Sequence, residues 1–458
     1  MRSVLLAALL AAPAVAADLT AGAAATVITP PLGTSMAGYY YSRAADGIHD
    51  DLYAKALVLG VGDARVALVA LDLISTNRPM VMAARREVER LTGIPGGHVM
   101  ISATHAHTGP VLSTTSLRDA FDAGTDLARR YSEELPAKIA DAVKRADAAR
   151  QPVQAKVGRG HEEGIAFNRR YHMADGTVGW NPGVGNPRIV KPAGGIDPDV
   201  HVLTFGPPGK KPAICYVNHA VHLDTVGGTK FSADLPGVLA KLLEESIAPG
   251  LQTVYTTGCC GDVNHVNVAW DDKSQKGFEQ ASRMAVILGA EVLRTLPKLQ
   301  PVAATGLRVR SELVKLPLPP VTVEDVAKAK DVIARRGDGK SGQVPFLEQV
   351  AAFKALDVAE RKGEPHEVEV QVIALGSDVA WVSLPGEMFA ELGRAVKQDS
   401  PFAHTVVAEL ANGSVGYVPA RRAYAQGNYE VVSTRVAMGG GEMLIDAAVR
   451  LLKELHTK

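Results

Sequence analysis

The sequence predicts an α/β fold in which mixed β-sheet layers are flanked by helices. Short runs of apolar and β-branched residues recur along the chain, and stretches with the periodicity of amphipathic helices separate many of them. This alternation is typical of layered proteins in which helices cover buried strands. Polar clusters also follow several strands directly, so we expect a functional site at the C-terminal ends of the strands.

The composition limits the architecture and the partners. The 458 residues carry a formal net charge of +0, and 47% of them are hydrophobic, so the chain can bury one large core or two moderate ones. The even balance of charge and the lack of a long basic run argue against nucleic acid as a partner. Aromatic residues make up only 5% of the chain, which argues against an aromatic-lined stacking groove.

The N-terminal residues have the pattern of a secretory signal peptide. Arg2 precedes an apolar run over 4–12, and small residues follow at 14–16. We predict a signal peptide over 1–17 and a secreted or periplasmic protein. The apolar run is too short to span a bilayer, and no later segment reaches about 18 consecutive apolar residues, so we expect no transmembrane segment after signal removal.

Residues 18–458 are expected to form a single domain. Apolar runs at 55–61 and 64–73, separated by Gly62 and Asp63, predict a β-hairpin. The other strands predicted up to Pro301 are 98–101, 153–157, 201–205, 213–217 and 253–257. The helices predicted between them are 79–92, 132–149, 232–247 and 275–295.

The character of the sequence changes after Pro301. Two charged, amphipathic helices are predicted at 323–336 and 346–360. We expect the segment 321–362 to be a helical insertion or lid, with a pair of merely solvated helices as the alternative. The remaining chain predicts strands at 368–375, 379–384 and 405–410, a helix directly after Glu387, a Tyr-rich loop at 412–430 and a helix at 441–455.

The strand at 98–101 leads into two histidines, His105 and His107, before Gly109-Pro110 turns the chain. Residues i and i+2 of a strand point to the same face, so we expect the two imidazoles to project together into a cleft. Both could bind a metal, or one could bind it while the other handles a proton. Two polar residues that merely cap a strand are the alternative.

Other polar residues follow other strands, namely His219, His222, Asp262 and Glu387. Two histidines and a carboxylate are a common ligand set of hydrolytic zinc sites, in which one position stays open for water. The spacing therefore predicts a mononuclear zinc site formed by His105, His222 and Glu387 at the C-terminal ends of the strands. His219 is the alternative to His222.

The three cysteines, Cys215, Cys259 and Cys260, are too few for a disulfide scaffold. Packing as small hydrophobic residues is the simplest expectation for them. A disulfide between Cys215 and one of the other two is the alternative in an oxidising compartment.

Five blocks between about residues 38 and 442 form a wider pattern. They are the run 102–110 (Ser-Ala-Thr-His-Ala-His-Thr-Gly-Pro), Asn168-Arg169, the segment 218–237 around His222, the run 384–387 (Leu-Pro-Gly-Glu), and Gly416-Tyr417 followed by Tyr429-Glu430. Together they resemble the neutral (non-lysosomal) ceramidases and their bacterial relatives, in which the first block reads S-G/A-T-H-x-H-S/T-G-P.

The resemblance implies a neutral-ceramidase-like catalytic domain and a role for each matching residue. Its zinc ligands would be His105, His222, Glu387 and Tyr417. His107 and Arg169 would contact the scissile amide and its developing oxyanion, with Tyr429 beside them. Tyr424 is an alternative for either tyrosine role. Imidazole and hard oxygen ligands both suit zinc, and an Arg and a His aimed at one oxygen stabilise an oxyanion.

The chain departs from this family at two points. The family carries G-D-x-S-P-N, with a catalytically important serine, whereas Asn264 stands at the serine position here. An amide cannot act as a nucleophile, so we expect zinc-activated water to attack, with Asn264 or His265 as a polar contact. We also expect the chain to lack the family's immunoglobulin-like C-terminal domain.

The sequence therefore predicts a secreted zinc-dependent hydrolase that cleaves a linear amide (N-acyl) bond in a small-molecule or lipid-like substrate. A zinc-dependent esterase, lactonase or amidase acting on a small non-ceramide metabolite is the first alternative, favoured by Asn264. A non-catalytic binding homologue is the second alternative.

Overall fold

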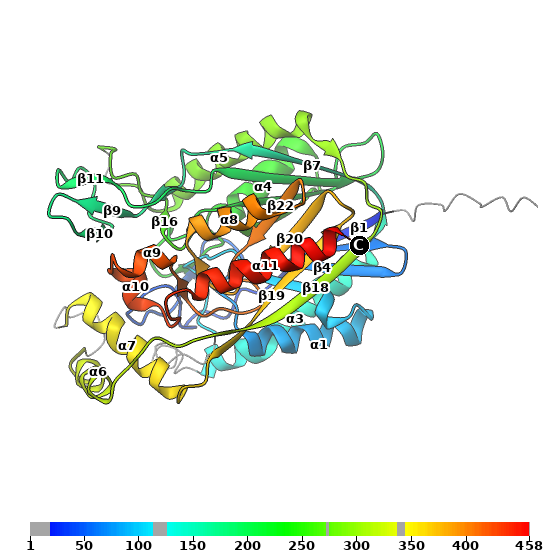
Figure 1. Ribbon diagram of the computed structural model, residues 1–458. Coiled ribbons are helices and arrows are strands. Elements are labelled where there is room, and N and C mark those ends of the chain that lie inside the picture. The colour runs from blue at the N-terminus through cyan, green and yellow to red at the C-terminus, as the bar shows by residue number, and fades with distance from the viewer. Residues whose placement is uncertain (1–18, 113–125, 272–273, 337–343, 458) are drawn as a thin grey trace, which may run out of the picture.

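Three large sheets form the framework of the computed structural model, which describes residues 19–112, 126–271, 274–336 and 344–457 (Figure 1). The predicted signal peptide over 1–17 lies outside the described residues. Each large sheet is antiparallel except for one parallel pair of strands at one edge. The α/β fold with mixed sheets and flanking helices is thus confirmed. No helix within the described ranges combines the length and apolar character that crossing a bilayer requires.

The first sheet contains the predicted hairpin. Its strand order is β5 (Val99–Ala103), β4 (Ala64–Leu71), β3 (Tyr53–Val61), β1 (Leu19–Val27) and β6 (Gln151–Pro152). Two helices, α1 (Arg78–Thr92) and α3 (Asp126–Ala148), cover its outer face, where Val69, Val88 and Leu135 belong to one buried cluster. The N-terminal cap of α1 is Asn77, whose side-chain oxygen accepts a hydrogen bond from the backbone N–H of Met80.

The second sheet has the order β15 (Gln252–Thr257), β13 (Ile214–His219), β12 (Asp199–Gly206), β7 (Gln154–His161) and β17 (Gln300–Pro301). Helices α4 (Leu235–Ile247) and α5 (Phe278–Thr295) cover its outer face. Asp234 caps α4 by accepting the N–H of Leu235, so the predicted helix at 232–247 begins slightly later than expected.

The third sheet has the order β18 (Leu307–Leu316), β19 (His366–Leu375), β20 (Val379–Ser383) and β22 (His404–Ala408). Helices α8 (Ala390–Asp399) and α11 (Gly440–His456) lie over it in Figure 1, and their apolar residues share a buried cluster with the outer face of the sheet. The helix expected directly after Glu387 begins only at Ala390, because Glu387 and Met388 form the short strand β21 first.

The inner faces of the three sheets meet in one shared core. Leu57 and Leu68 of the first sheet, Phe205 and Tyr216 of the second and Trp381 of the third belong to the same buried cluster. The Tyr216 and Trp381 rings pack edge to face with centroids 6.1 Å apart. Strands buried on both faces need apolar residues at nearly every position, which explains why the strand signals in the sequence are continuous rather than alternating.

Short strands join loops that are far apart in the sequence. These pairs are β2 (Gly47–Ile48) with β14 (Lys230–Phe231), β8 (Phe167–Asn168) with β16 (Val263–Asn264), and β21 (Glu387–Met388) with β23 (Tyr417–Val418). A three-stranded sheet of β10 (Val178–Trp180), β9 (Arg170–Met173) and β11 (Ile189–Pro192) projects beyond them. The predicted Tyr-rich loop contains β23 and two short helices, α9 (Arg421–Tyr424) and α10 (Tyr429–Ser433).

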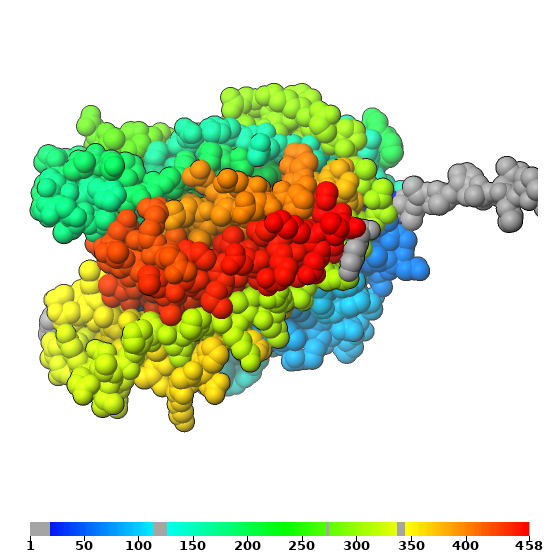
Figure 2. Space-filling model, in the orientation of Figure 1, coloured from blue at the N-terminus to red at the C-terminus, as the bar shows by residue number. Residues whose placement is uncertain are grey.

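The helices predicted at 323–336 and 346–360 are present as α6 (Val323–Arg336) and α7 (Phe346–Glu360). They pack against one another through a small apolar cluster of their own that includes Val332 and Ala352. Figure 2 shows them at one end of the molecule, below the orange-red segment that holds α10, and α7 contacts α10 directly. The pair therefore stands next to the residues 417–430.

The chain after β22 ties the three sheets together. The backbone N–H of Glu409 donates to Thr257 in the second sheet at 3.1 Å, and the N–H of Asn412 donates to Ile101 in the first at 2.8 Å. The Asn412 side chain accepts from the Ile101 N–H at 3.0 Å and donates to Gln371 in the third sheet at 2.9 Å. Its φ of 60° is a left-handed conformation that asparagine tolerates better than most residues.

We expect Asn412→Ala to lower the free energy of unfolding by about 3 kcal/mol, because it leaves buried partners on two sheets unsatisfied. Chemical denaturation measures the change. Asn77→Ala is the matched control, since it removes one helix cap and should cost only about 1 kcal/mol. Equal losses for both variants would contradict a clamping role for Asn412.

Candidate active site

The candidate residues follow the C-terminal ends of the parallel strands at the edge of each of the three large sheets. The chain leaving β5 carries His105 and His107, and the chain leaving β13 carries His222. The chain leaving β20 carries Glu387. These residues meet because the three sheets share one core and are joined at that end by the segment 409–412. The site thus lies at strand C-terminal ends, as the sequence predicts.

His105 does not reach the site in the way we expected. The strand β5 ends at Ala103, and His105 lies beyond it in a left-handed conformation with φ of 72°. The same-face argument for a strand was therefore wrong for this pair. A turn brings the two rings together instead, with centroids 4.9 Å apart, and hydrogen bonds from the backbone N–H groups of His105 and Ala106 to the carbonyl of Leu73 hold that turn.

His105, His107 and His222 form a buried cluster that could bind a metal ion. The Nε2 atom of His222 lies 3.1 Å from Nε2 of His105 and 3.0 Å from Nε2 of His107. Nδ1 of His105 donates to the carbonyl of Ile74 at 2.7 Å, which leaves the lone pair on its Nε2 in the neutral ring. Burial lowers the pKa of His107 to about 3 and that of His222 well below its usual value. Neutral imidazoles are the form that binds metals.

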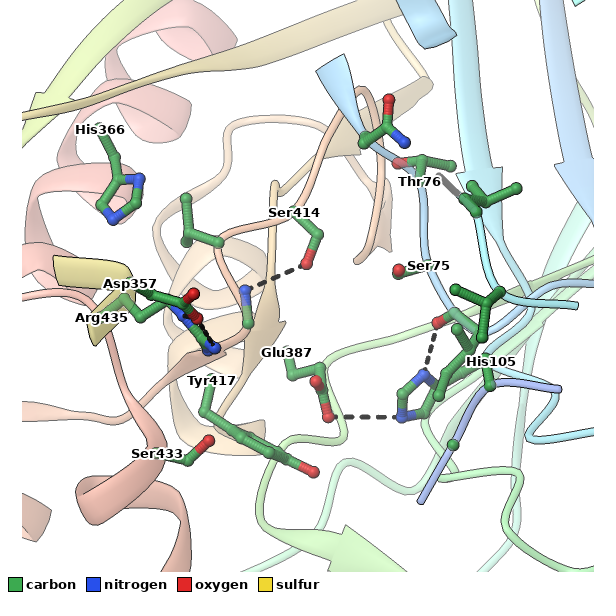
Figure 3. Close-up of a pocket in the computed structure, with 18 of the residues that line it drawn as sticks. Ser75, Thr76, His105, Asp357, His366, Glu387, Ser414, Tyr417, Ser433 and Arg435 are labelled. Carbon is green, nitrogen blue, oxygen red and sulfur yellow. Dashed lines mark hydrogen bonds and ion pairs between the residues drawn. The ribbon is translucent and has the colours of Figure 1, made fainter. Parts of the chain in front are cut away.

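Glu387 and Tyr417 stand beside this cluster because β21 and β23 pair them directly in register. Figure 3 shows the Glu387 carboxylate and the His105 ring pointing toward one another, and Oε2 of Glu387 is 3.4 Å from Nε2 of His105. Burial raises the pKa of Glu387, but His105, Tyr417 and Arg169 outweigh burial and hold it at about 2. The carboxylate is therefore ionised at neutral pH.

Arg169 brings a fixed positive charge to the histidines. One terminal nitrogen lies 3.4 Å from Nδ1 of His222, and the other donates to the carbonyl of Gly261 at 2.7 Å. Its Nε donates to Glu430 at 2.9 Å, and the guanidinium lies 5.3 Å from the centre of the Tyr417 ring. Because the side chain is buried, these contacts leave it little freedom to move.

Glu430 is a supporting residue that sequence reasoning did not assign a role. Its buried carboxylate accepts from Arg169 on one oxygen and from Arg170 on the other, at 2.9 and 2.6 Å. Two consecutive arginines, Arg169 between β8 and β9 and Arg170 at the start of β9, were the available signal, since both cannot be buried without a carboxylate. Glu430 thus fixes the direction in which Arg169 points.

Asp262 lies outside the histidine cluster, and its hydrogen bonds hold the chain around Asn168 and Arg169. Its carboxylate accepts from the Asn168 side chain and from the N–H of Ala390, both at 2.8 Å. Burial raises its pKa to about 6. The carbonyl of Asp262 also accepts the N–H of Arg169 at 2.9 Å, so this residue positions Arg169 rather than contacting the histidines.

The structure also places the alternative residues. Nδ1 of His219 lies 3.1 Å from the carbonyl of Asp199, and the Tyr424 hydroxyl donates to the carbonyl of Val436 at 2.9 Å. Of the competing residues, His222 and Tyr417 are therefore the ones brought to the cluster. The cysteines Cys215, Cys259 and Cys260 are buried and free in the described structure, so the alternative of a disulfide is not formed.

Two cavities of about 570 and 500 Å³ meet at this cluster. Both are lined by His107, Tyr417 and Tyr429. The first, seen in Figure 3, contains His105 and Glu387 and is bordered further out by charged side chains. These are Asp357, Glu360, Arg361, Glu364 and Arg435.

The second cavity contains Arg169, His222 and Asn264 and has an aromatic wall. The rings that line it are Tyr39, Tyr40, Tyr41, Trp180, Phe346, Tyr417 and Tyr429. The expectation that no aromatic-lined groove exists was therefore wrong. A low overall content of aromatic residues does not prevent the fold from gathering many of them at one place.

No protein-family model and no curated protein sequence match this chain. Solved structures of ceramidases are similar to it in three dimensions, among them the following two. Neutral ceramidase from Pseudomonas aeruginosa superposes with a TM-score of 0.75 at 20% identity, over 96% of this chain and 75% of that chain. A ceramidase complexed with C2 gives a TM-score of 0.73 at 18% identity, over 96% and 76%. The chain therefore has the fold of these ceramidases.

We expect Glu430→Ala to lower the free energy of unfolding by about 3–5 kcal/mol, because it leaves two buried guanidinium groups without their carboxylate. Glu312→Ala is the matched control. It breaks an exposed ion pair with Arg450 and should cost less than about 1 kcal/mol. Thermal or denaturant unfolding gives both values, and similar costs would contradict the bridging role of Glu430.

Proposed function

We propose that this protein is a secreted zinc-dependent hydrolase of the neutral ceramidase superfamily that cleaves linear amide (N-acyl) bonds. One observation carries the proposal. His105, His222, Glu387 and Tyr417 converge beside Arg169 where two cavities meet, in a chain that has the ceramidase fold. The proposal of export, to the periplasm or the medium, rests on the pattern of residues 1–17.

The donor set fits zinc. Imidazole nitrogens and carboxylate or phenol oxygens are suitable zinc ligands. Glu387 Oε2 is buried and has no hydrogen-bond partner among the described residues, beyond its ion-pair contact with His105. We assign His105, His222, Glu387 and Tyr417 as the residues that would hold the ion. When bound there, zinc would polarise the scissile carbonyl and lower the pKa of water.

His107 is close enough to be a ligand as well, but we assign it to the substrate. It lines both cavities, and its Nδ1 lies 3.7 Å from a carboxylate oxygen of Asp224. A carboxylate on that side would fix the ring and favour the proton on Nδ1, leaving Nε2 to accept or return a proton during amide cleavage.

Arg169 supplies a positive charge that would stabilise the negative charge on an amide oxygen as the carbonyl carbon becomes tetrahedral. Its guanidinium is held by Glu430 and Gly261 before any substrate binds, so no rearrangement is needed as the negative charge develops. Tyr429 packs edge to face against Tyr417, with ring centroids 5.3 Å apart, and lines both cavities. Asn264 carries an amide, so this position does not supply the attacking oxygen.

The second candidate is an esterase, lactonase or amidase that acts on a small non-ceramide metabolite. The charged side chains of the first cavity favour it, since Glu360, Arg361 and Glu364 would make poor contacts for a long alkyl chain. A non-catalytic binding homologue would keep the cavities but hydrolyse nothing.

A substrate panel separates these candidates. N-acyl amides of rising chain length, matched esters and lactones are incubated with the purified protein, and product release is measured. The main proposal predicts that linear amides are cleaved fastest. Faster turnover of esters or lactones would decide for the second candidate, and metal-dependent hydrolysis of none of them would contradict both.

We expect His105→Ala and Glu387→Ala to lose most of their bound zinc, because each removes one ligand. His107→Ala should retain zinc and lose about 100-fold or more in turnover, because it removes a proton-transfer group. Elemental analysis and amide hydrolysis measure the two effects. His161→Ala, which changes an exposed histidine, is the control and should retain both properties. Full zinc content in His105→Ala or Glu387→Ala would contradict the ligand assignment.

A further inference from the structure

The second cavity is lined by several aromatic rings and by buried polar side chains. The proposed amide hydrolysis does not by itself require this lining. We call this cavity the aromatic arm. Its wall is defined by Tyr39, Tyr40, Tyr41, Trp180, Phe346 and Tyr429, and its floor by the polar lining residues His222, Asn264 and His265. Its volume of about 500 Å³ lies in the range of small-molecule binding pockets. It opens directly beside His107 and Arg169.

Four segments far apart in the sequence form the wall. Trp180 from β10 lies 4.4 Å from Tyr429 of α10 and 5.7 Å from Phe346 of α7, centroid to centroid. The Trp180 and Phe346 rings are nearly parallel, at 14°. Tyr40 meets Phe346 edge to face at 5.3 Å. The helical segment that begins α7 therefore contributes one side of the arm.

The floor holds a polar group without a protein partner. His265 is only 1% exposed, and neither of its ring nitrogens has a hydrogen-bond partner among the residues that the structure describes. Burial lowers its pKa to about 4, so the ring is neutral at pH 7 and offers one donor and one acceptor. A buried polar side chain without a partner costs free energy unless a ligand satisfies it.

We propose that the aromatic arm is a specificity pocket for a compact aromatic group of the substrate, and that Trp180 and Phe346 determine this preference. The wall offers flat ring faces for stacking, and the floor offers His265 to a polar atom attached to the substrate ring. A long alkyl chain would leave His265 without a partner. This inference rests on the proposed amide hydrolysis for the position of the scissile bond, but binding in the arm is independent of turnover.

The first experiment compares acyl and amine groups. N-benzoyl, N-acetyl and N-hexadecanoyl amides of one amine are hydrolysed, together with N-acetyl amides of benzylamine and ethylamine. In either the acyl series or the amine series, we expect the aromatic substrate to have a kcat/KM at least 10-fold higher than the non-aromatic substrates of the same series. Trp180→Ala and Phe346→Ala should abolish that preference, by raising KM for the aromatic substrate more than for the smallest substrate. No aromatic preference in either series would overturn the proposal.

Matched controls come from the same chain. Leu347 has the same 38% exposure as Phe346 and is not among the described residues that line the arm. Trp270 is a partly exposed tryptophan that packs on Phe167 elsewhere. Leu347→Ala and Trp270→Ala should leave the substrate preference unchanged. If an alanine variant fails to fold, Phe346→Leu and Trp180→Phe replace it in the experiment, because they keep most of the side-chain volume of the wall.

The second experiment measures binding without turnover. Benzamide is titrated into the purified protein while tryptophan emission is followed. We expect saturable quenching that disappears in Trp180→Phe, weakens at least 5-fold in Phe346→Ala and persists in Leu347→Ala. His265→Leu should weaken benzamide more than toluene, which has no hydrogen-bonding atom.

The two experiments keep the inference separate from the proposed function. Quenching by benzamide with no amide hydrolysis would uphold the pocket and overturn the enzymatic proposal. Amide hydrolysis with no aromatic preference and no benzamide binding would uphold the enzyme and overturn the pocket.

Discussion

The site depends on the hydrogen bonds by which the segment 409–412 joins three sheets. Each sheet ends in a parallel pair of strands, and the residues that leave those strands can meet only if the sheets keep their register. Glu409 and Asn412 hold that register through Thr257 and Ile101. The Glu409 carboxylate also accepts the N–H of Met388 at 2.8 Å, which ties the Glu387 turn to the same segment. Packing alone is less directional than these bonds.

Buried charge is the second constraint. Arg169 and Arg170 share the single carboxylate of Glu430, and Glu387 lies ionised beside the histidines. A guanidinium that is already desolvated and held in place can stabilise a developing oxyanion without reorganising. The same arrangement makes the site sensitive to the loss of any one charge, because the remaining groups cannot return to water. Stability and the proposed chemistry therefore rest on the same contacts.

Local sequence patterns predicted most of the framework. The hairpin at 55–61 and 64–73 and the covering helices depend on periodicity and turns, which neighbouring residues determine. The rule that sites gather at strand ends brought His222 and Glu387 into the prediction. His105 reached its place through a left-handed turn that strand alternation did not predict.

The other features that the sequence did not predict depend on contacts between distant segments. The register of β21 with β23, which places Glu387 beside Tyr417, joins loops about thirty residues apart. The role of Glu430 follows from two arginines more than 250 residues away. The aromatic arm is formed by residues from the loop before β2, from β10, from α7 and from α10. The composition gives the number of such residues, but their positions relative to one another depend on the tertiary fold.

The central claim is that the four residues His105, His222, Glu387 and Tyr417 hold one zinc ion. Anomalous X-ray scattering from crystals, collected on both sides of the zinc absorption edge, tests it most directly. If these four residues hold zinc, we expect one strong peak about 2.0–2.2 Å from a donor atom of each of them, with His107 outside the coordination sphere. A peak coordinated by His107 in place of Glu387 or Tyr417, or no zinc peak at this cluster in zinc-supplemented crystals, would contradict the ligand assignment.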